Sequence, residues 1–160
     1  MKKQLNDQIE ISFPETFHVM NDEEMKRQFS NAKNRIAAKN DENHTVLSVG
    51  WSEPLNLVTG IFVTESSFLD GYYKRGAKGL KNFKKEKSIT NTICGREAKG
   101  FAFSYLTDDG STVQNGAVTA FKRGKRIYIV EYISGSTDML YCNMAYDMVI
   151  GSIKMINKVQ

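Results

Sequence analysis

The sequence predicts an α+β fold, an α/β/α sandwich in which three helices flank one antiparallel sheet of six to seven strands. Two observations predict it. From Ser88 onward, strand-like stretches follow one another and are joined by short turns, which is typical of antiparallel pairing. Elsewhere, apolar residues recur at helical spacing behind capping residues. With 160 residues, 41% of them hydrophobic, the chain is long enough to bury the core of one globular domain spanning residues 1–160.

The first elements are a strand and a helix. Gln8 to Pro14 alternates apolar with polar residues, as a half-buried strand does, and the proline ends it. Asn21 can cap a helix because Glu24 occupies the reciprocal capping position. Apolar residues at spacings of four, three and four then form one helical stripe: Met25, Phe29, Ala32 and Ile36. We expect this helix to end near residues 39–43.

Two strands and a second helix follow. His44 to Trp51 and Leu57 to Thr64 have strand composition, and the second is almost continuously apolar, as in a strand buried on both faces. Ser66 or Ser67 can cap the second helix, although glycines inside it each cost about 1 kcal/mol relative to alanine. Its apolar residues are Phe68, Tyr72, Leu80 and Phe83.

An antiparallel meander and a third helix complete the chain. Asp108-Asp109-Gly110 and Arg123-Gly124-Lys125 have the composition of hairpin turns. The third helix is capped around Ser136-Thr137-Asp138 and is expected to run to about Asn157. The four predicted strands of the meander are Ser88 to Cys94, Arg96 to Leu106, Thr112 to Phe121, and Arg126 to Ile133.

The positive charge is concentrated in the second half of the chain. The formal net charge is +4. Residues 1–65 contain 7 basic and 10 acidic residues, a net −3, whereas residues 66–160 contain 15 basic and 8 acidic residues, a net +7. An anionic partner is therefore to be sought in the second half.

Three segments resemble a known group of proteins. They are Ile11-Ser12-Phe13-Pro14, the strand Gly100-Phe101-Ala102-Phe103-Ser104-Tyr105, and Tyr128-Ile129-Val130-Glu131-Tyr132 before the last helix. With the order of elements, they resemble the PsbP-like fold, shared by a photosystem accessory protein and a Ran-binding regulator of nuclear transport. The resemblance implies a non-enzymatic binding or accessory role, and many bacterial members are exported or lipid-anchored. The chain differs in reading Glu15-Thr16-Phe17 where a Gly-aromatic pair often follows the proline.

No signal for catalysis, a cofactor or a metal stands out. His18 and His44 have no companion motif, and Asp108-Asp109-Gly110 lacks the further acidic positions of a calcium loop. Cys94 and Cys142 have no metal-binding spacing, and we expect both thiols to be buried. We therefore expect no cofactor and no metal, and we favour a protein that is not an enzyme.

The N-terminal residues lack the apolar stretch of a secretory signal, and no apolar run approaches the roughly 20 residues that span a bilayer. We expect a cytoplasmic protein without a membrane span, or an exported one if a signal has been removed.

A basic cluster is predicted on the second helix. At about 100° per residue, its four lysines fall within about 60° of arc on a helical wheel: Lys74, Lys78, Lys81 and Lys85. One reading is a solvated charged face. The other is an anion-binding ridge for nucleic acid, anionic lipid or an acidic protein. The second basic segment, residues 122–126, would matter only if it lay next to the first, and no nucleic-acid-binding motif accompanies the lysines.

The last helix has apolar residues on two sides. The expected core face contains Met139, Cys142, Tyr146, Val149, Ile150 and Ile153. The second stripe contains Tyr141, Met144, Met148 and Met155. This stripe is either covered by a loop or the N-terminal segment, or it forms an interface, since methionines adapt to partner surfaces. The interface would be a homodimer seam or a docking site for another chain.

The leading functional hypothesis is therefore a binding or accessory domain that acts through protein–protein contacts. The alternative is a small-molecule-binding domain or enzyme with a pocket between sheet and helix, around Trp51, Phe101, Phe103 and Tyr105. A third is a nucleic-acid binder, which would require both basic segments on one face.

Overall fold

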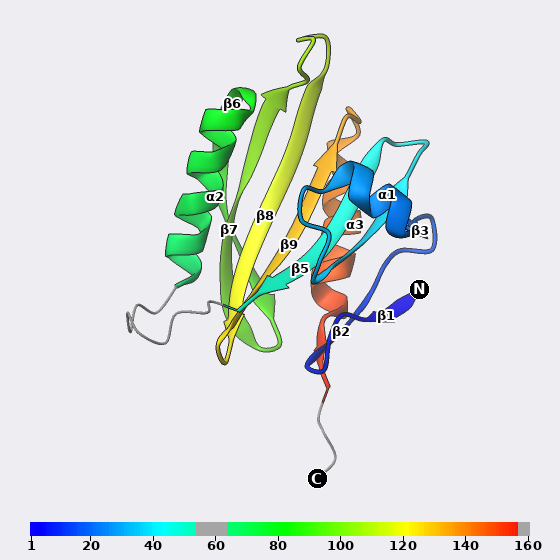
Figure 1. Cartoon of the computed structure of the whole chain (residues 1–160), viewed down its shortest axis with the longest axis vertical. Coiled ribbons are helices and arrows are strands. Elements are labelled where there is room, and N and C mark those ends of the chain that lie inside the picture. Colours follow the sequence, from blue (N-terminus) through cyan, green and yellow to red (C-terminus); the bar gives the residue numbers. More distant parts are fainter. Residues whose placement is uncertain (54–63, 157–160) are drawn as a thin grey trace.

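The computed structural model describes residues 1–53 and 64–156. The strands of its large antiparallel sheet are β3 (His18–Val19), β4 (Arg35–Asn40), β5 (Thr45–Ser52), β6 (Lys81–Ile93), β7 (Arg96–Leu106), β8 (Val113–Arg123) and β9 (Arg126–Ser134). The strand order is β3-β4-β5-β9-β8-β7-β6. A smaller sheet joins β1 (Lys2–Gln4), β2 (Ile9–Ser12) and β10 (Lys154–Met155). The helices are α1 (Asp22–Gln28), α2 (Glu65–Gly79) and α3 (Met139–Ser152) (Figure 1). The predicted α+β fold is confirmed.

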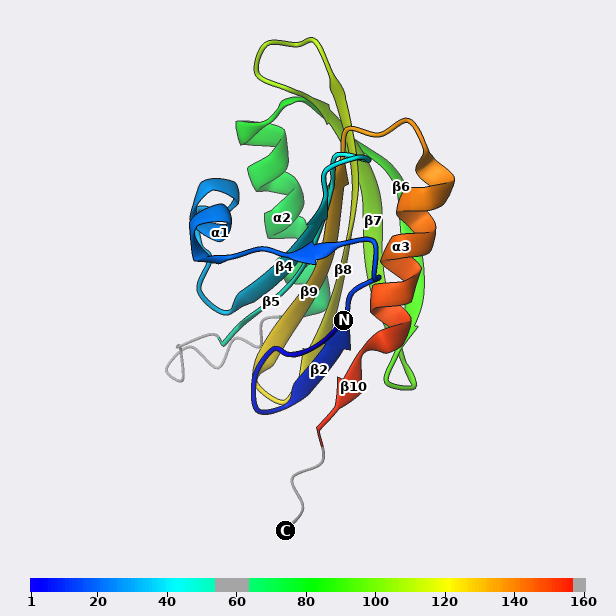
Figure 2. The ribbon, with the colours of Figure 1, turned by 90° about the vertical axis from the view of Figure 1, so that its right-hand side faces the viewer.

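Helices cover both faces of the large sheet (Figure 2). One face packs against α3 and the small sheet, and the core there includes the fully buried Ile9, Ile11 and Val149. The other face carries α1, over β4, and α2, over β6, β7 and β8. Because side chains alternate along a strand, β9 serves both layers: Tyr128, Val130 and Tyr132 face α3, whereas Ile129, Glu131 and Ile133 face α2.

The first predicted helix is too long. The Asn21 capping box with Glu24 is present, but α1 ends at Gln28. Arg35–Asn40, predicted as helix, is the strand β4, which pairs with β5 along its whole length. The burial of both Ala37 and Ala38 fits a strand, because adjacent side chains on a strand point to opposite faces of the sheet, and each face here has its own core cluster. Strand pairing therefore overrides the helical spacing of Ala32 and Ile36.

The second and third helices also end earlier than predicted. Thr64 caps α2, Leu80 is its C-cap, and Phe83 already lies on β6. α3 ends at Ser152, after which β10 pairs with β2. Of the predicted strand Leu57 to Thr64, all but Thr64 lies outside the described residues.

The two cysteines differ. Cys142 is buried as expected, but Cys94 is exposed in the β6–β7 turn, so the prediction of two buried thiols was wrong for that residue.

Candidate binding surfaces

The outward face of α3 presents three large apolar side chains to solvent. Leu140, Met144 and Met148 are 72%, 58% and 58% exposed. They follow one another at intervals of four residues, which aligns them on one side of the helix. We call these three residues the outer stripe. They account for three of the seven exposed large apolar residues among the described ranges.

Only part of the predicted second stripe belongs to this surface. Met144 and Met148 are exposed, but Tyr141 is half-buried, stacks on Phe17 with 6.4 Å between ring centroids, and accepts a hydrogen bond from Asn40. Met155 lies on β10 and packs against the core, so its placement on the helix was wrong. The N-terminal segment thus covers Tyr141 and leaves the two methionines open.

Leu140 was not among the predicted interface residues. Its spacing from Met144 and Met148 is the signal that would have found it, because residues 140, 144 and 148 span only about 80° of a helical wheel. The helix carries no lysine or arginine, and Asp147 is its only charged residue. The outer stripe is therefore an apolar surface with little charge beside it.

The basic cluster is divided between two elements. Lys74 and Lys78 are exposed on α2, whereas Lys81 and Lys85 are exposed on the strand β6. The helical-wheel alignment of all four was therefore wrong, because the helix ends before Lys81. Lys85 extends over the ring of Phe101, with its Nζ 5.4 Å from the ring centroid.

The second basic segment lies at the opposite end of the sheet. Lys81 is paired with Leu106 at one end of β7, whereas the β8–β9 hairpin, drawn in yellow, closes near the other end (Figure 1). β7 has 11 residues, so the two segments are roughly 35 Å apart at about 3.3 Å per residue. The nucleic-acid-binding hypothesis required both basic segments on one face, and their positions at opposite ends of the sheet give it no support.

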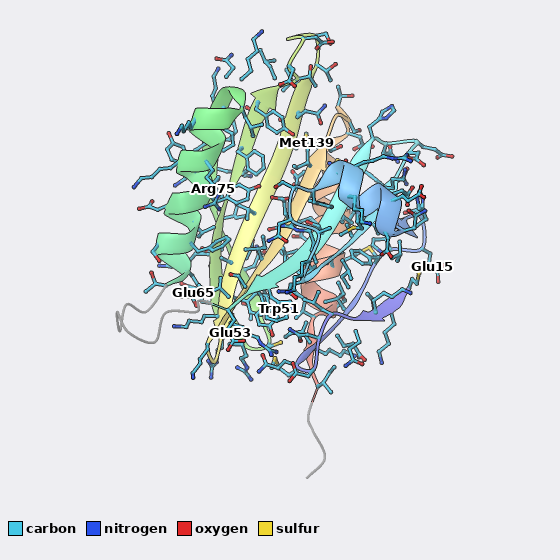
Figure 3. All side chains as sticks on the ribbon, viewed as in Figure 1. Glu15, Trp51, Glu53, Glu65, Arg75 and Met139 are labelled. Atoms are coloured by element: carbon cyan, nitrogen blue, oxygen red, sulfur yellow. The ribbon has the colours of Figure 1, made fainter. Side chains whose placement is uncertain are left out.

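Arg126 in that hairpin is already engaged. It forms ion pairs with Asp7 and Glu53, and its guanidinium carbon lies 4.5 Å from the ring centroid of Trp51. Figure 3 shows Trp51 and Glu53 together at this end of the sheet.

A buried charged group, Glu131, is paired with two residues that line a groove on the α2 face. Glu131 of β9 accepts a hydrogen bond from the Tyr72 hydroxyl of α2 and lies 3.7 Å from Nη1 of Arg35. Burial, and then the neighbouring Glu131 carboxylate, raises the pKa of Tyr72 well above its ordinary value. Arg35 also donates to Ser48 Oγ at 2.8 Å. Arg35 and Tyr72 line an open cavity of about 380 Å³ together with Phe68, Arg75, Gly76, Gly79, Leu80 and Ile129.

The four aromatic residues that were predicted to surround one pocket do not do so. Phe101 and Phe103 are 3% and 2% exposed and pack with Tyr105 under α2. Trp51 packs into the core on the other face of the sheet. These aromatic residues are core components, and the prediction that they surround one pocket was wrong.

Two further classes of site were sought within residues 1–53 and 64–156. No three His, Cys, Asp or Glu side chains there are grouped to hold a metal ion. Among the same residues, none of the helices has the length and apolar character needed to cross a bilayer.

The comparisons with known proteins show the fold alone. No family model and no curated protein matches the sequence. The structure is similar to cyanobacterial PsbP from Synechocystis, with 14% identity, a TM-score of 0.62, and coverage of 94% of this chain and 88% of that one. It is also similar to LpqN of Mycobacterium tuberculosis, a protein involved in cell envelope biogenesis, with 12% identity, a TM-score of 0.59, and 93% and 83% coverage. A Pseudomonas aeruginosa protein of unknown function matches with 11% identity, a TM-score of 0.54, and 72% and 74% coverage. The chain therefore has the PsbP-like fold.

Proposed function

We propose that this chain is a non-enzymatic binding domain, spanning residues 1–160, that docks a protein partner through the outer stripe of α3. The observation that carries the proposal is the exposure of Leu140, Met144 and Met148 on one side of one helix. A contiguous apolar surface of this kind marks interaction sites more often than scattered exposed residues do.

Apolar burial on the outer stripe would supply part of the free energy of such a contact. Fully burying a leucine or methionine side chain contributes about 1.5–3 kcal/mol. With the exposed fractions above, covering the outer stripe would contribute about 3–5 kcal/mol. The partner surface that fits is apolar, because the only charge on the helix is that of Asp147.

Small-molecule binding in the α2 groove is the second candidate. It is favoured by the buried Glu131, Tyr72 and Arg35 beside the cavity of about 380 Å³. However, Glu131 is already paired with Tyr72 and Arg35, so its charge does not depend on a ligand for a partner. The outer stripe, in contrast, has no cover among the described residues.

Met148→Glu tests the docking proposal, with Val113→Glu as the matched control, because Val113 is also exposed, at 52%, but lies on β8. Solution mass from light scattering shows first whether the wild type self-associates. Affinity capture from the native cell, followed by titration of the captured protein, then gives its affinity for wild type and both variants. We expect Met148→Glu to weaken association at least about tenfold, since it removes apolar contact and forces a carboxylate to lose water.

Both variants should keep the wild-type unfolding transition, because both positions are on the surface. Equal weakening by the two variants, or the same association in all three proteins, contradicts the proposal. Loss of a homodimer only would identify the partner as a second copy.

A further inference from the structure

β6 is one of the two outermost strands of the large sheet. β6 pairs with β7 on one side and has no strand partner on its other side among the described residues. The two-residue turn Cys94-Gly95 has φ values of 50° and 75°, as in a type I′ turn. In such a hairpin the flanking pair, Ile93 and Arg96, exchanges both backbone hydrogen bonds. Counting back from that pair, Ser88, Thr90 and Thr92 turn their N–H and C=O groups to the open edge.

The two halves of β6 differ in charge. Its first half carries Lys81, Lys84, Lys85 and Lys87 with a single acidic residue, Glu86. Lysines on an edge strand oppose uncontrolled pairing with other chains. The remaining residues, Ser88–Ile93, contain no charge and alternate exposed with more buried side chains. We call Ser88–Ile93 the edge segment; its length is that of an ordinary strand, about five to six residues.

Hollows flank the edge segment on both faces of the sheet, and both are lined by Ser88, Ile89 and Thr90. On the α2 face, a cavity of about 580 Å³ is bordered by Leu69, Tyr73 and Phe101. Its charged lining residues are Lys85, Lys99 and Asp70. On the α3 face, a cavity of about 350 Å³ is bordered by Lys87, Asn143 and Asp147. Because side chains alternate along a strand, an added strand would direct successive side chains into one hollow and then the other.

We infer that the edge segment of β6 binds an extended segment of a partner protein, which adds to the sheet as an eighth strand. The exposed N–H and C=O groups of Ser88, Thr90 and Thr92 supply the backbone hydrogen bonds. An apolar side chain of the bound segment packs beside Tyr73 and Phe101, and acidic residues at the end of the segment face Lys85 and Lys87. The site is separate from the outer stripe, so this inference goes beyond the proposed docking through α3.

The charges favour an acidic segment over a second copy of β6. If two edge segments paired antiparallel, the lysine-rich half of each β6 would extend past the turn of the other copy, close to its Arg96. Like charges would then meet at both ends of the contact, which is destabilising. An acidic segment instead gains from the same lysines.

The test uses a fluorescein-labelled peptide of alternating valine and threonine, roughly ten residues long, with glutamate at both ends. Fluorescence anisotropy gives its affinity, and amide shifts of ¹⁵N-labelled protein locate it. We expect the largest shifts at Ser88, Thr90 and Thr92. Thr90→Pro should weaken binding at least about tenfold, because proline removes an outward N–H that the sheet itself does not use. Thr90→Ala keeps that N–H and should bind as the wild type does.

Two further peptides complete the test. Methylation of the peptide's backbone nitrogens should abolish binding, and lysine in place of glutamate should weaken it about tenfold. Met148→Glu should leave binding unchanged, which separates this site from the outer stripe. The inference is overturned if the methylated peptide binds as well as its parent or if Thr90→Pro binds as Thr90→Ala does. It is also overturned if the largest shifts fall on the outer stripe, or if no binding occurs at about 1 mM peptide.

Discussion

Replacing Arg35 by methionine should destabilise the protein because it leaves the Glu131 carboxylate buried without its cation. The side chains of Glu131 and Arg35 are only 10% and 17% exposed, and 3.7 Å separates their nearest charged atoms. Removing one member of a buried ion pair costs about 3–5 kcal/mol. The hydroxyl of Tyr72 still donates to Glu131 in the variant, so we expect about 2–4 kcal/mol for Arg35→Met.

A double-mutant cycle isolates the electrostatic part of this cost. Glu131→Gln removes the charge and keeps the side-chain volume, so Arg35→Met should cost less in that background, by about 1–3 kcal/mol. Urea unfolding followed by the fluorescence of Trp51, the single tryptophan, and by circular dichroism measures each corner of the cycle. Arg35→Met should lower the urea midpoint by about 1–2 M. Additive effects of the two substitutions, within about 0.5 kcal/mol, would refute the coupling of Arg35 to Glu131.

Three further predictions concern other parts of the fold. Hydrogen bonds from the Lys39 ammonium, 2.8 Å away, and from the Asn21 backbone lower the pKa of Glu24 from 4.5 to about 2. This carboxylate therefore stabilises the fold above about pH 4.5 and ceases to do so as the pH falls to about 2. The Tm difference between wild type and Glu24→Gln should shrink across that pH range, and a constant difference contradicts this. Gly100→Ala would place a Cβ 1.9 Å from the Val118 carbonyl oxygen and should lower the free energy of unfolding in urea by roughly 1–3 kcal/mol. Gly79→Ala has open space around its new Cβ and should raise that free energy by up to about 1 kcal/mol. Equal effects of the two substitutions would show that β8 shifts at no cost. Asp138→Ala removes the side chain that accepts from the Tyr141 N–H, so the free energy of unfolding should fall by about 0.5–2 kcal/mol, and an unchanged value would show that this cap is dispensable.

Periodicity and turn composition were enough to predict the meander and the core face of α3. Cys142, Tyr146 and Val149 are buried as their spacing requires. The failures arose where a segment contacts another part of the chain, which the spacing within that segment does not reveal. Ile36 fits a helical stripe, yet β4 is held as a strand by pairing with β5.

The same cause limited the prediction of the binding surfaces. Nothing in the spacing of Tyr141 indicates that Phe17 stacks on it, so the stripe could not be divided into covered and open parts from the sequence. Lys81 and Lys85 continue the helical spacing of Lys74 and Lys78, but Leu80 ends the helix between the two pairs. In both cases the sequence identified the surface residues but not the parts of the structure that lie beside them.

The small sheet also affects how the protein is made. β2 pairs with β10, which aligns Glu10 with Lys154, so this contact joins residues that are far apart in the sequence. During synthesis, Ile9 and Ile11 emerge from the ribosome long before β10 and α3, against which they are buried at 0% exposure. These two isoleucines must wait until α3 and β10 have been translated, and contacts so distant in sequence form slowly. Until then the apolar side of β2 has no partner, and a chaperone could hold it until α3 and β10 emerge.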